Sequence, residues 1–204
     1  MQTERTALKE WAVMVDALGC GDIIAIVRKG GIRDRDESGV GFSLRHSRFV
    51  FYPTRFHQST EQLSEGLVAR LARSHAAMET GGMVRIEYVA HAAICFTVTD
   101  FARLAMARHE LGLSESALEA RFFYRRPGLT LSALRVQRLR NPIVIPELRR
   151  YGGCVSWLEL DDTIACDIDD VAPVMSEPEF QERLAELVAP LCGDEMPLAS
   201  GDWG

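Results

Sequence analysis

The 204-residue sequence has no long apolar run and no apolar N-terminus. No window approaches the ~18 unbroken apolar residues that a membrane-spanning helix requires, which excludes that class of membrane protein. The first ten residues, MQTERTALKE, are charged where a secretory signal peptide is apolar. We therefore expect a soluble, cytoplasmic protein with no membrane partner. The hydrophobic content of 47% in turn excludes intrinsic disorder.

Cysteine and histidine are too scattered to indicate a metal site. The five cysteines show no CxxC spacing, and the five histidines form no HxH or HxxxH pair. In a chain without a secretory signal, an odd number of cysteines is typical of reduced thiols. The sequence also has neither GxxxxGK(S/T) nor GxGxxG, the loops that hold nucleotide phosphates. We expect no metal and no cofactor.

Lysine is scarce, and the arginines that take its place are unevenly distributed. The chain has 21 arginines and two lysines, Lys9 and Lys29. Residues 1–150 carry 22 basic and 16 acidic side chains, whereas residues 151–204 carry one arginine and 13 acids. Eight of the arginines, against a single glutamate, fall within residues 121–150. This asymmetry favours a polyanionic partner such as RNA or DNA; the alternative is that acidic and basic faces pair within the fold.

The hydrophobic pattern predicts an α+β fold. Apolar residues at helical spacing between Leu8 and Leu18 predict a first helix, and the short apolar run at 23–27 predicts a buried strand. From 84 to 98 every even position is apolar, which predicts a strand long enough to curl or bulge. The same criteria predict strands at 49–52, 129–139 and 155–160, and helices at 60–74, in two pieces within 100–122, and after Ser176.

These elements are expected to form one domain. The chain shows no internal repeat and no linker, so residues 1–192 are predicted to form a single α+β domain with a bent mixed sheet and flanking helices. Residues 193–204 have little to pack against and are predicted to form a flexible acidic tail. The sequence does not indicate an oligomeric state.

The first candidate site is the segment RKGGIR at 28–33, which directly follows the predicted strand at 23–27. Paired glycines allow backbone N–H groups to approach an anion, and cationic side chains flank them on both sides. We therefore predict that Lys29 and Arg33 contact an anionic ligand. The alternative is a hairpin turn whose charges are solvated.

A second candidate site is the segment FYPTRFHQ at 51–58. Its aromatic, basic, imidazole and amide side chains suit base stacking and the recognition of base edges. His57 could also act as an acid or base, although no Ser or Cys partner is identifiable. Alternatively, Tyr52 and Phe56 belong to the core. The residues predicted here as ligand contacts are Tyr52, Arg55, His57 and Gln58.

Two later segments complete the candidate surface. FFYRRPG at 122–128 leads into an arginine-rich strand, and basic residues interleaved with aromatics favour a groove that follows a nucleic-acid backbone. The alternative is that this strand packs against the acidic C-terminal helix. In YGGCVSW at 151–157 a tight glycine turn would place Trp157 at the mouth of a sheet as a ligand contact; otherwise Trp157 closes the core. The predicted nucleic-acid contacts are Arg125, Arg126 and Arg138.

Five segments together resemble a bacterial family that is defined only as a domain of unknown function. They are ALKEWAVMVDAL (7–18), IVRKGGIR (26–33), FVFYPTRFHQ (49–58), LRVQRL (134–139) and YGGCVSW (151–157), in the order of the family. The resemblance implies no established activity. Where the family more usually has a single Glu after RKGGI, this chain has Arg33 followed by DRDE, so an acidic role is hard to place there.

The order of the elements is also similar to that of PUA-like domains, because a long bent strand, helical pieces and a strand that runs into Asn141-Pro142 follow one another. Those small barrels bind RNA or modified bases, so this weaker resemblance implies a barrel-like sheet and a nucleic-acid ligand. We predict a domain that recognises nucleic acid or a nucleotide-like anion, with no reaction assigned. We expect segments 24–33 and 52–58 to meet in one cleft.

Two other functions are open as alternatives. A metal-dependent nuclease of the PD-(D/E)XK type needs an acid two residues before a lysine on one strand, but Ala7 and Val27 occupy those positions. Only a migrated Lys29, with Asp22 or Glu87, would restore such a site. A structural or protein-interaction module fits every feature except the basic stretch.

Overall fold

The computed structural model of the protein describes residues 3–30, 42–77, 82–153, 155–161, 164 and 166–191, so Arg33 and the predicted tail lie outside the described residues. The strands are β1 (Thr3–Glu4), β2 (Thr6–Trp11), β3 (Ala25–Arg28), β4 (Arg48–Thr54), β5 (Met83–Val98), β6 (Leu129–Pro146), β7 (Trp157–Glu159), β8 (Cys166–Asp167) and β9 (Val171–Pro173). The helices are α1 (Ala12–Gly19), α2 (Glu65–Ala77), α3 (Phe101–Met106), α4 (Glu115–Phe123) and α5 (Glu177–Val188), with 3-10 turns η1 (Thr60–Gln62), η2 (Arg108–Glu110) and η3 (Arg149–Tyr151). No helix within these described ranges is long and apolar enough to span a bilayer.

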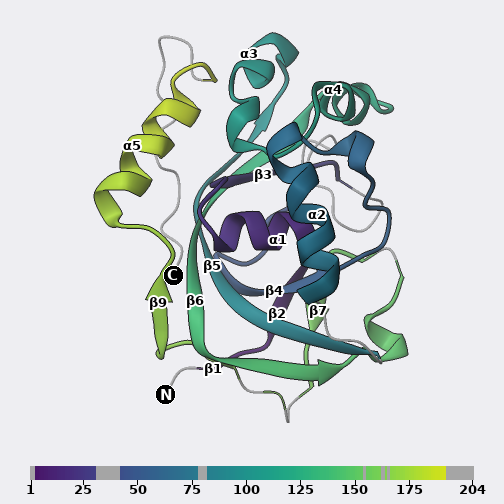
Figure 1. Ribbon diagram of the computed structural model, residues 1–204. Helices are drawn as coiled ribbons and strands as arrows, with labels where there is room; N and C mark the ends of the chain where they lie inside the picture. Colours follow the sequence, from purple (N-terminus) through teal and green to yellow (C-terminus); the bar gives the residue numbers. More distant parts are fainter. Residues whose placement is uncertain are drawn as a thin grey trace.

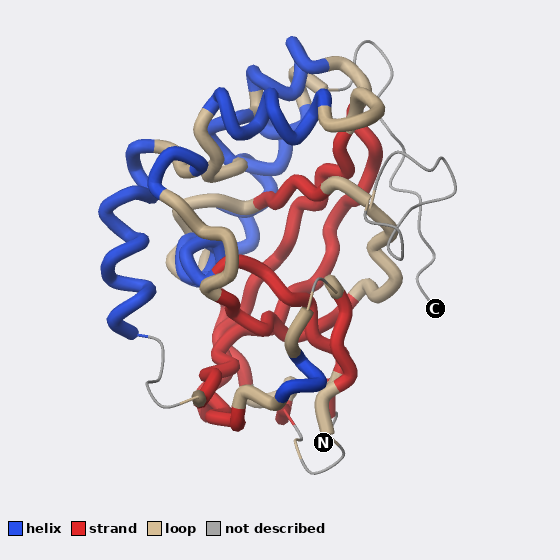
Figure 2. The backbone as a smooth tube through the Cα atoms, turned by 90° about the vertical axis from the view of Figure 1, so that its right-hand side faces the viewer, coloured by secondary structure: helices blue, strands red, loops and turns tan. Residues whose placement is uncertain are grey.

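Seven strands form one mixed sheet that curls around a central helix. Six follow the order β3-β6-β5-β4-β2-β7, and β9 pairs with β6. β2 and β4 run parallel, whereas the other pairs in this sheet are antiparallel. Figure 1 shows β4, β5 and β6 passing around α1, and Figure 2 shows the helices gathered at the top and one side of the strands. The α+β domain is confirmed, but β3 and β7, the two ends of this order, do not pair with each other, so the described strands leave the sheet open.

The two longest strands, β5 and β6, carry the irregularities that the alternating pattern predicts. Their antiparallel ladder shifts register at Glu87 and again at Ala93. The first shift sets residues 139–142 of β6 opposite Glu87 alone, so Pro142, which has no N–H to donate, lies where the ladder with β5 requires none. For this reason β6 continues to Pro146, beyond the predicted end of the strand.

The N-terminal segment differs from its prediction. The helix expected from Leu8 begins only at Ala12, and residues 6–11 form β2 instead. β2 lies between β4 and β7, so its backbone is paired on both sides, and Leu8 is fully buried. Tertiary pairing overrides a hydrophobic spacing that fits a short buried strand as well as a helix. The second helix also begins later than predicted, at Glu65.

α1 fills the hollow of the curled sheet. Seven of its eight residues are buried, and a core cluster joins them to Phe49 and Phe51 of β4 and to α2. At the end of α1, a Cβ on Gly19 would lie 2.2 Å from Cζ of Tyr88, so only glycine fits there. A second cluster packs α3, α4 and α5 around β3. The strand ends of β2, β3 and β4 thus meet on the side of the fold where α4 lies.

Candidate functional site

The carboxyl-terminal ends of β2, β3 and β4 border a pocket of about 460 Å³. β2 and β4 are parallel and paired as far as Trp11 and Thr54, so the segments that leave them start at the same edge. α4 and the segment before β7 supply the remaining walls. Four of the described lining side chains are cationic and one is a carboxylate. The lining residues are Lys9, Glu10, Trp11, Val27, Arg28, Lys29, Thr54, Phe56, His57, Arg121, Gly153, Val155 and Ser156.

Arg28 joins the two ends of the open sheet in this pocket. From the end of β3, its Nη1 donates to the Lys9 carbonyl at 3.0 Å and to Oε2 of Glu10 at 2.6 Å, both on β2. Its Nη2 donates to Oγ of Ser156, just before β7, at 3.0 Å. The side chains of Arg28 and Glu10 are only 17% and 13% exposed. The one carboxylate of the described lining is therefore already paired.

Arg121 of α4 has a different environment. Its guanidinium carbon lies 4.4 Å from the centre of the Trp11 ring, and it forms no ion pair with any carboxylate in the described ranges. Burial, and then the neighbouring charge of Arg28, lower the pKa of Arg121, while Glu10 acts in the opposite direction. A desolvated guanidinium without a carboxylate partner is a strong receptor for an entering oxyanion.

The two lysines of the pocket face backbone carbonyls. Nζ of Lys29 donates to the Phe122 and Gly128 carbonyls at 3.2 and 2.7 Å and to the Arg126 carbonyl. Burial lowers the pKa of Lys29. Nζ of Lys9, a residue only 9% exposed, donates to the Tyr151 carbonyl and, at 3.2 Å, to the Gly153 carbonyl. Both ammonium groups thus tie neighbouring segments to the sheet.

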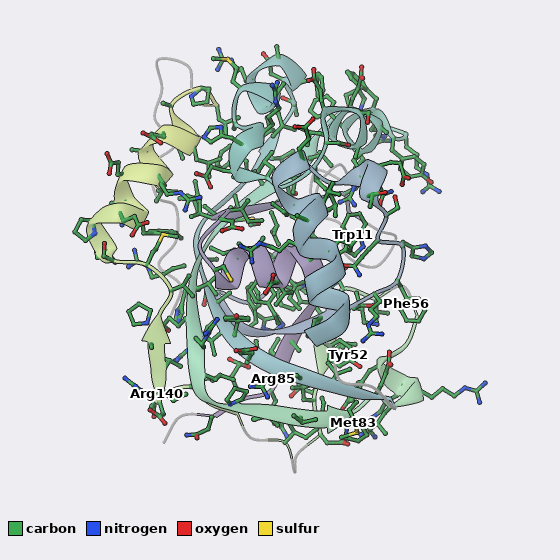
Figure 3. All side chains as sticks on the ribbon, in the orientation of Figure 1. Trp11, Tyr52, Phe56, Met83, Arg85 and Arg140 are labelled. Atoms are coloured by element: carbon green, nitrogen blue, oxygen red, sulfur yellow. The ribbon has the colours of Figure 1, made fainter. Side chains whose placement is uncertain are left out.

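A second hollow of about 400 Å³ adjoins the pocket and shares Lys29 and Arg121 with it. Tyr124, which is 56% exposed, borders this hollow, and Phe56, 62% exposed, borders the first pocket. Figure 3 shows Trp11 and Phe56 on the same side of the molecule. Two exposed aromatic rings, those of Phe56 and Tyr124, therefore border the hollows that contain Lys29 and Arg121.

The structure brings together the two segments that were expected to meet. Lys29, after β3, and His57, after β4, both line the first pocket. His57 is exposed and has a left-handed backbone with φ of 64°, which turns the chain beyond Thr54. Arg55 is exposed beside them but is not among the lining residues.

Three other residues that were predicted as ligand contacts, Tyr52, Gln58 and Trp157, make contacts within the protein. Tyr52 is 2% exposed and packs against Tyr151, and its burial raises its pKa. Oε1 of Gln58 accepts from the Val13 N–H at 3.0 Å, which satisfies a donor in the first turn of α1. The ring of Trp157 packs against the rings of Phe42, His46 and Phe49. Trp157 is thus partly buried and packs against the core cluster, the arrangement described by the alternative interpretation of this segment.

The predicted nucleic-acid contacts divide into two groups. Arg125 and Arg126 are exposed in the turn after α4, next to Lys29. Arg138 lies farther along β6, where it donates to the Tyr88 hydroxyl at 2.8 Å and lies 3.6 Å from Glu87. The arrangement does not bring Arg138 to the pocket.

Three other arginines of residues 121–150 pair with acids of the C-terminal quarter. We call Arg135, Arg140 and Arg150 the basic flank. Their partners are Glu177, Asp170 and Asp161, respectively. Figure 3 shows Arg140 far from Trp11 and Phe56. The flank is thus neutralised within the fold.

The acids of the nuclease alternative do not lie beside Lys29. Asp22 pairs with Arg70, and Glu87 lies 3.4 Å from Arg85 and 3.6 Å from Arg138. Neither acid lines the pocket. Within the described ranges, no group of three or more His, Cys, Asp or Glu side chains is placed to hold a metal ion.

The sequence did not single out Glu10, Trp11 or Arg121 as site residues. Trp11 fits the spacing of the helix predicted there. Arg121 is the first arginine of the basic stretch 121–150, and no motif distinguishes it from the others. The two halves of this stacked pair, Trp11 and Arg121, are 110 positions apart in the sequence. Only the motif ALKEW, which includes Lys9 and Glu10, gave a signal, through the family resemblance.

Comparisons with known proteins give a family and a set of similar structures. No significant match is found among curated proteins. Solved structures similar to the chain include the ASCH protein of Zymomonas mobilis, at 15% identity over 89% of this chain and 94% of that one, with a TM-score of 0.44. A serine-to-alanine mutant of the Zymomonas mobilis protein is also similar, at 15% identity over 79% and 92% of the two chains, with a TM-score of 0.45. A family model described as a domain of unknown function (DUF1802) matches residues 7–186, so the protein belongs to this family.

Proposed function

We propose that the protein binds a nucleic acid or a nucleotide-like anion in the pocket at the ends of β2, β3 and β4. The observation that carries this proposal is Arg121, whose half-buried side chain places its guanidinium on Trp11 and forms no ion pair with a described carboxylate. The nearby carboxylate of Glu10 is already bound to Arg28. An oxyanion that enters the pocket would gain charge-assisted hydrogen bonds from Arg121 and meet a net positive lining.

The aromatic residues of the site favour a ligand with bases over a simple anion. Phe56 borders the pocket and Tyr124 borders the adjoining hollow, and both rings are more than half exposed. Exposed rings beside cations are suited to bases stacked next to a charged backbone. The volumes, about 460 and 400 Å³, are in the range of small-molecule sites. We assign no reaction to this site.

Binding of short labelled oligonucleotides tests the proposal. Single-stranded RNA and DNA of about ten nucleotides would be titrated with protein at about 50 mM salt, and fluorescence anisotropy recorded. Arg121→Met is expected to weaken binding about tenfold or more, because it removes the receptor for a phosphate. The matched control is Arg140→Met, on the basic flank, which is expected to keep the wild-type affinity.

Two results would contradict the proposal. One is a wild-type protein with no measurable affinity for either oligonucleotide under these conditions. The other is an equal loss in Arg121→Met and Arg140→Met, which would indicate general charge attraction and no defined site. Binding of a folded protein partner instead of an oligonucleotide would favour the interaction-module alternative.

A further inference from the structure

The only two lysines of the chain have the same kind of environment. Lys29 extends from the end of β3 and donates to three backbone carbonyls, those of Phe122, Arg126 and Gly128. Lys9, on β2, donates to the carbonyls of Tyr151 and Gly153. In both cases one ammonium group gathers carbonyl oxygens from a segment more than ninety residues away in the sequence.

The segment held by Lys29 carries one wall of the pocket. Phe122 directly follows Arg121, so the carbonyl bound by Lys29 fixes the last turn of α4, which positions the guanidinium. A positive charge is also favourable at the C-terminus of a helix. Beyond Phe122, the backbone of Arg125 is left-handed with φ of 62°, and the Gly128 N–H returns to the Phe122 carbonyl at 3.1 Å. Lys29 therefore joins the end of α4 to both sides of the turn that follows it.

The segment held by Lys9 carries the opposite wall. Gly153 lines the pocket, and its φ of 80° is a left-handed conformation that favours glycine. Val155 and Ser156 follow and also line the pocket. Ser156 receives the hydrogen bond from Arg28. The position of this wall therefore sets where the Arg28 guanidinium is held.

The chemistry of the two cations explains why lysine occurs here in a chain that otherwise uses arginine. An ammonium group presents three donors around a point and suits several converging carbonyls. A guanidinium is a flat fork that suits a carboxylate or phosphate. With 21 arginines against two lysines, both lysines stand at positions where carbonyls converge, and the pocket arginines, Arg28 and Arg121, present the guanidinium groups.

We infer that Lys9 and Lys29 are positioning residues of the anion pocket: they hold its two walls through backbone carbonyls and do not themselves bind the anion. This inference rests on the proposed function of the same pocket. It gives Lys29 a role different from the ligand contact that the sequence predicts. The anion is received by Arg121, in a pocket whose shape the two lysines and the Arg28–Glu10 pair maintain.

The conservative exchange Lys29→Arg separates positioning from direct contact. It keeps the positive charge but cannot match the three carbonyls, so its affinity for the labelled oligonucleotides is expected to fall about tenfold, as far as that of Lys29→Met. A direct contact predicts instead that Lys29→Arg retains wild-type affinity and that only Lys29→Met loses it. Retention by Lys29→Arg would overturn the inference.

Limited trypsin digestion gives a readout that needs no ligand. Release of the turn after α4 should make cleavage after Arg125 at least about fivefold faster in Lys29→Arg and Lys29→Met, because proteolysis follows local opening. Cleavage after Arg55, which is exposed on a different segment, serves as the internal control and should not change. Unchanged cleavage after Arg125 would overturn the inference. If the wild-type protein bound no oligonucleotide, the proposed function would fail, and this digestion would still decide whether Lys29 holds the turn.

Discussion

The protein has two basic regions, and their arginines have opposite surroundings. On the basic flank, Arg135, Arg140 and Arg150 each meet an acid of the C-terminal quarter. In the pocket, Arg121 lies on the Trp11 ring and forms no ion pair with a described carboxylate. Both regions draw on the arginine-rich stretch 121–150, and the difference between them is whether a described carboxylate pairs with the arginine. The density of arginine in the sequence therefore does not by itself indicate which arginines lack a carboxylate partner, and this difference is the basis of the binding site that we propose.

The largest effect that we expect from the difference between pocket and flank is a loss of stability on substitution of Arg28. Arg28→Ala leaves the mostly buried Glu10 carboxylate without its partner and breaks the link between the sheet ends, so the free energy of unfolding should fall by about 3 kcal/mol. Arg140→Ala breaks a largely exposed pair on the flank and should cost less than about 1 kcal/mol. Urea unfolding curves measure both variants. Similar losses in the two would remove the distinction between pocket and flank.

An intermediate effect concerns how binding depends on salt. If Arg125 and Arg126 contact phosphates at the rim of the pocket, Arg125→Ala and Arg126→Ala should each weaken binding and flatten the plot of log affinity against log salt by about one. Arg138→Ala should leave that slope unchanged, because Arg138 donates to Tyr88 and lies close to Glu87. A flatter slope in Arg138→Ala would extend the binding surface to the flank.

The smallest expected effect is a pH dependence of stability that arises at His91, which does not line the pocket. Burial, and then the charges of Arg48 and Arg135, lower the pKa of His91 from 6.5, although a hydrogen bond with Gln137 opposes them. Below that ordinary value the unfolded chain therefore binds the proton more tightly than the folded protein does. The folded state loses stability as the pH falls below 6.5 towards the lowered pKa, and it regains that stability as the pH rises again.

His91→Gln should remove this part of the acid sensitivity. Urea midpoints of wild type and variant, compared at about pH 7 and about pH 5, measure it. The wild type is expected to lose more stability on acidification than the variant. An equal loss would show that His91 titrates alike in the folded and unfolded chains.

The elements that the sequence predicts well are those whose signal is local. The alternation over 84–98 gives β5, and Ser176, whose side chain accepts from the Glu179 N–H at 3.4 Å, marks the start of α5. Lys29, directly after β3, and His57, three residues after the end of β4, were predicted as ligand contacts from motifs that adjoin a strand, and both line the pocket. The signal for these features lies within a few residues of the feature itself.

The rest of the site depends on pairing between distant segments. The spacing between Leu8 and Leu18 fits a helix, and only the pairing of β2 with β4 and β7 makes its first part a strand. The curl of the sheet then brings Arg28 to Glu10, and the packing of α4 brings Arg121 to Trp11. No local pattern carries these contacts. Aromatic residues such as Trp157 also serve the core and a binding site equally well in sequence terms.

The most direct test is a crystal structure of the protein with a bound short single-stranded oligonucleotide. We predict a phosphate within hydrogen-bonding distance of the Arg121 guanidinium, between the walls held by Lys9 and Lys29. The flank pairs, such as that of Arg140 with Asp170, should remain intact. Phosphates bound along Arg135, Arg138 and Arg140, with no phosphate at Arg121, would contradict the account.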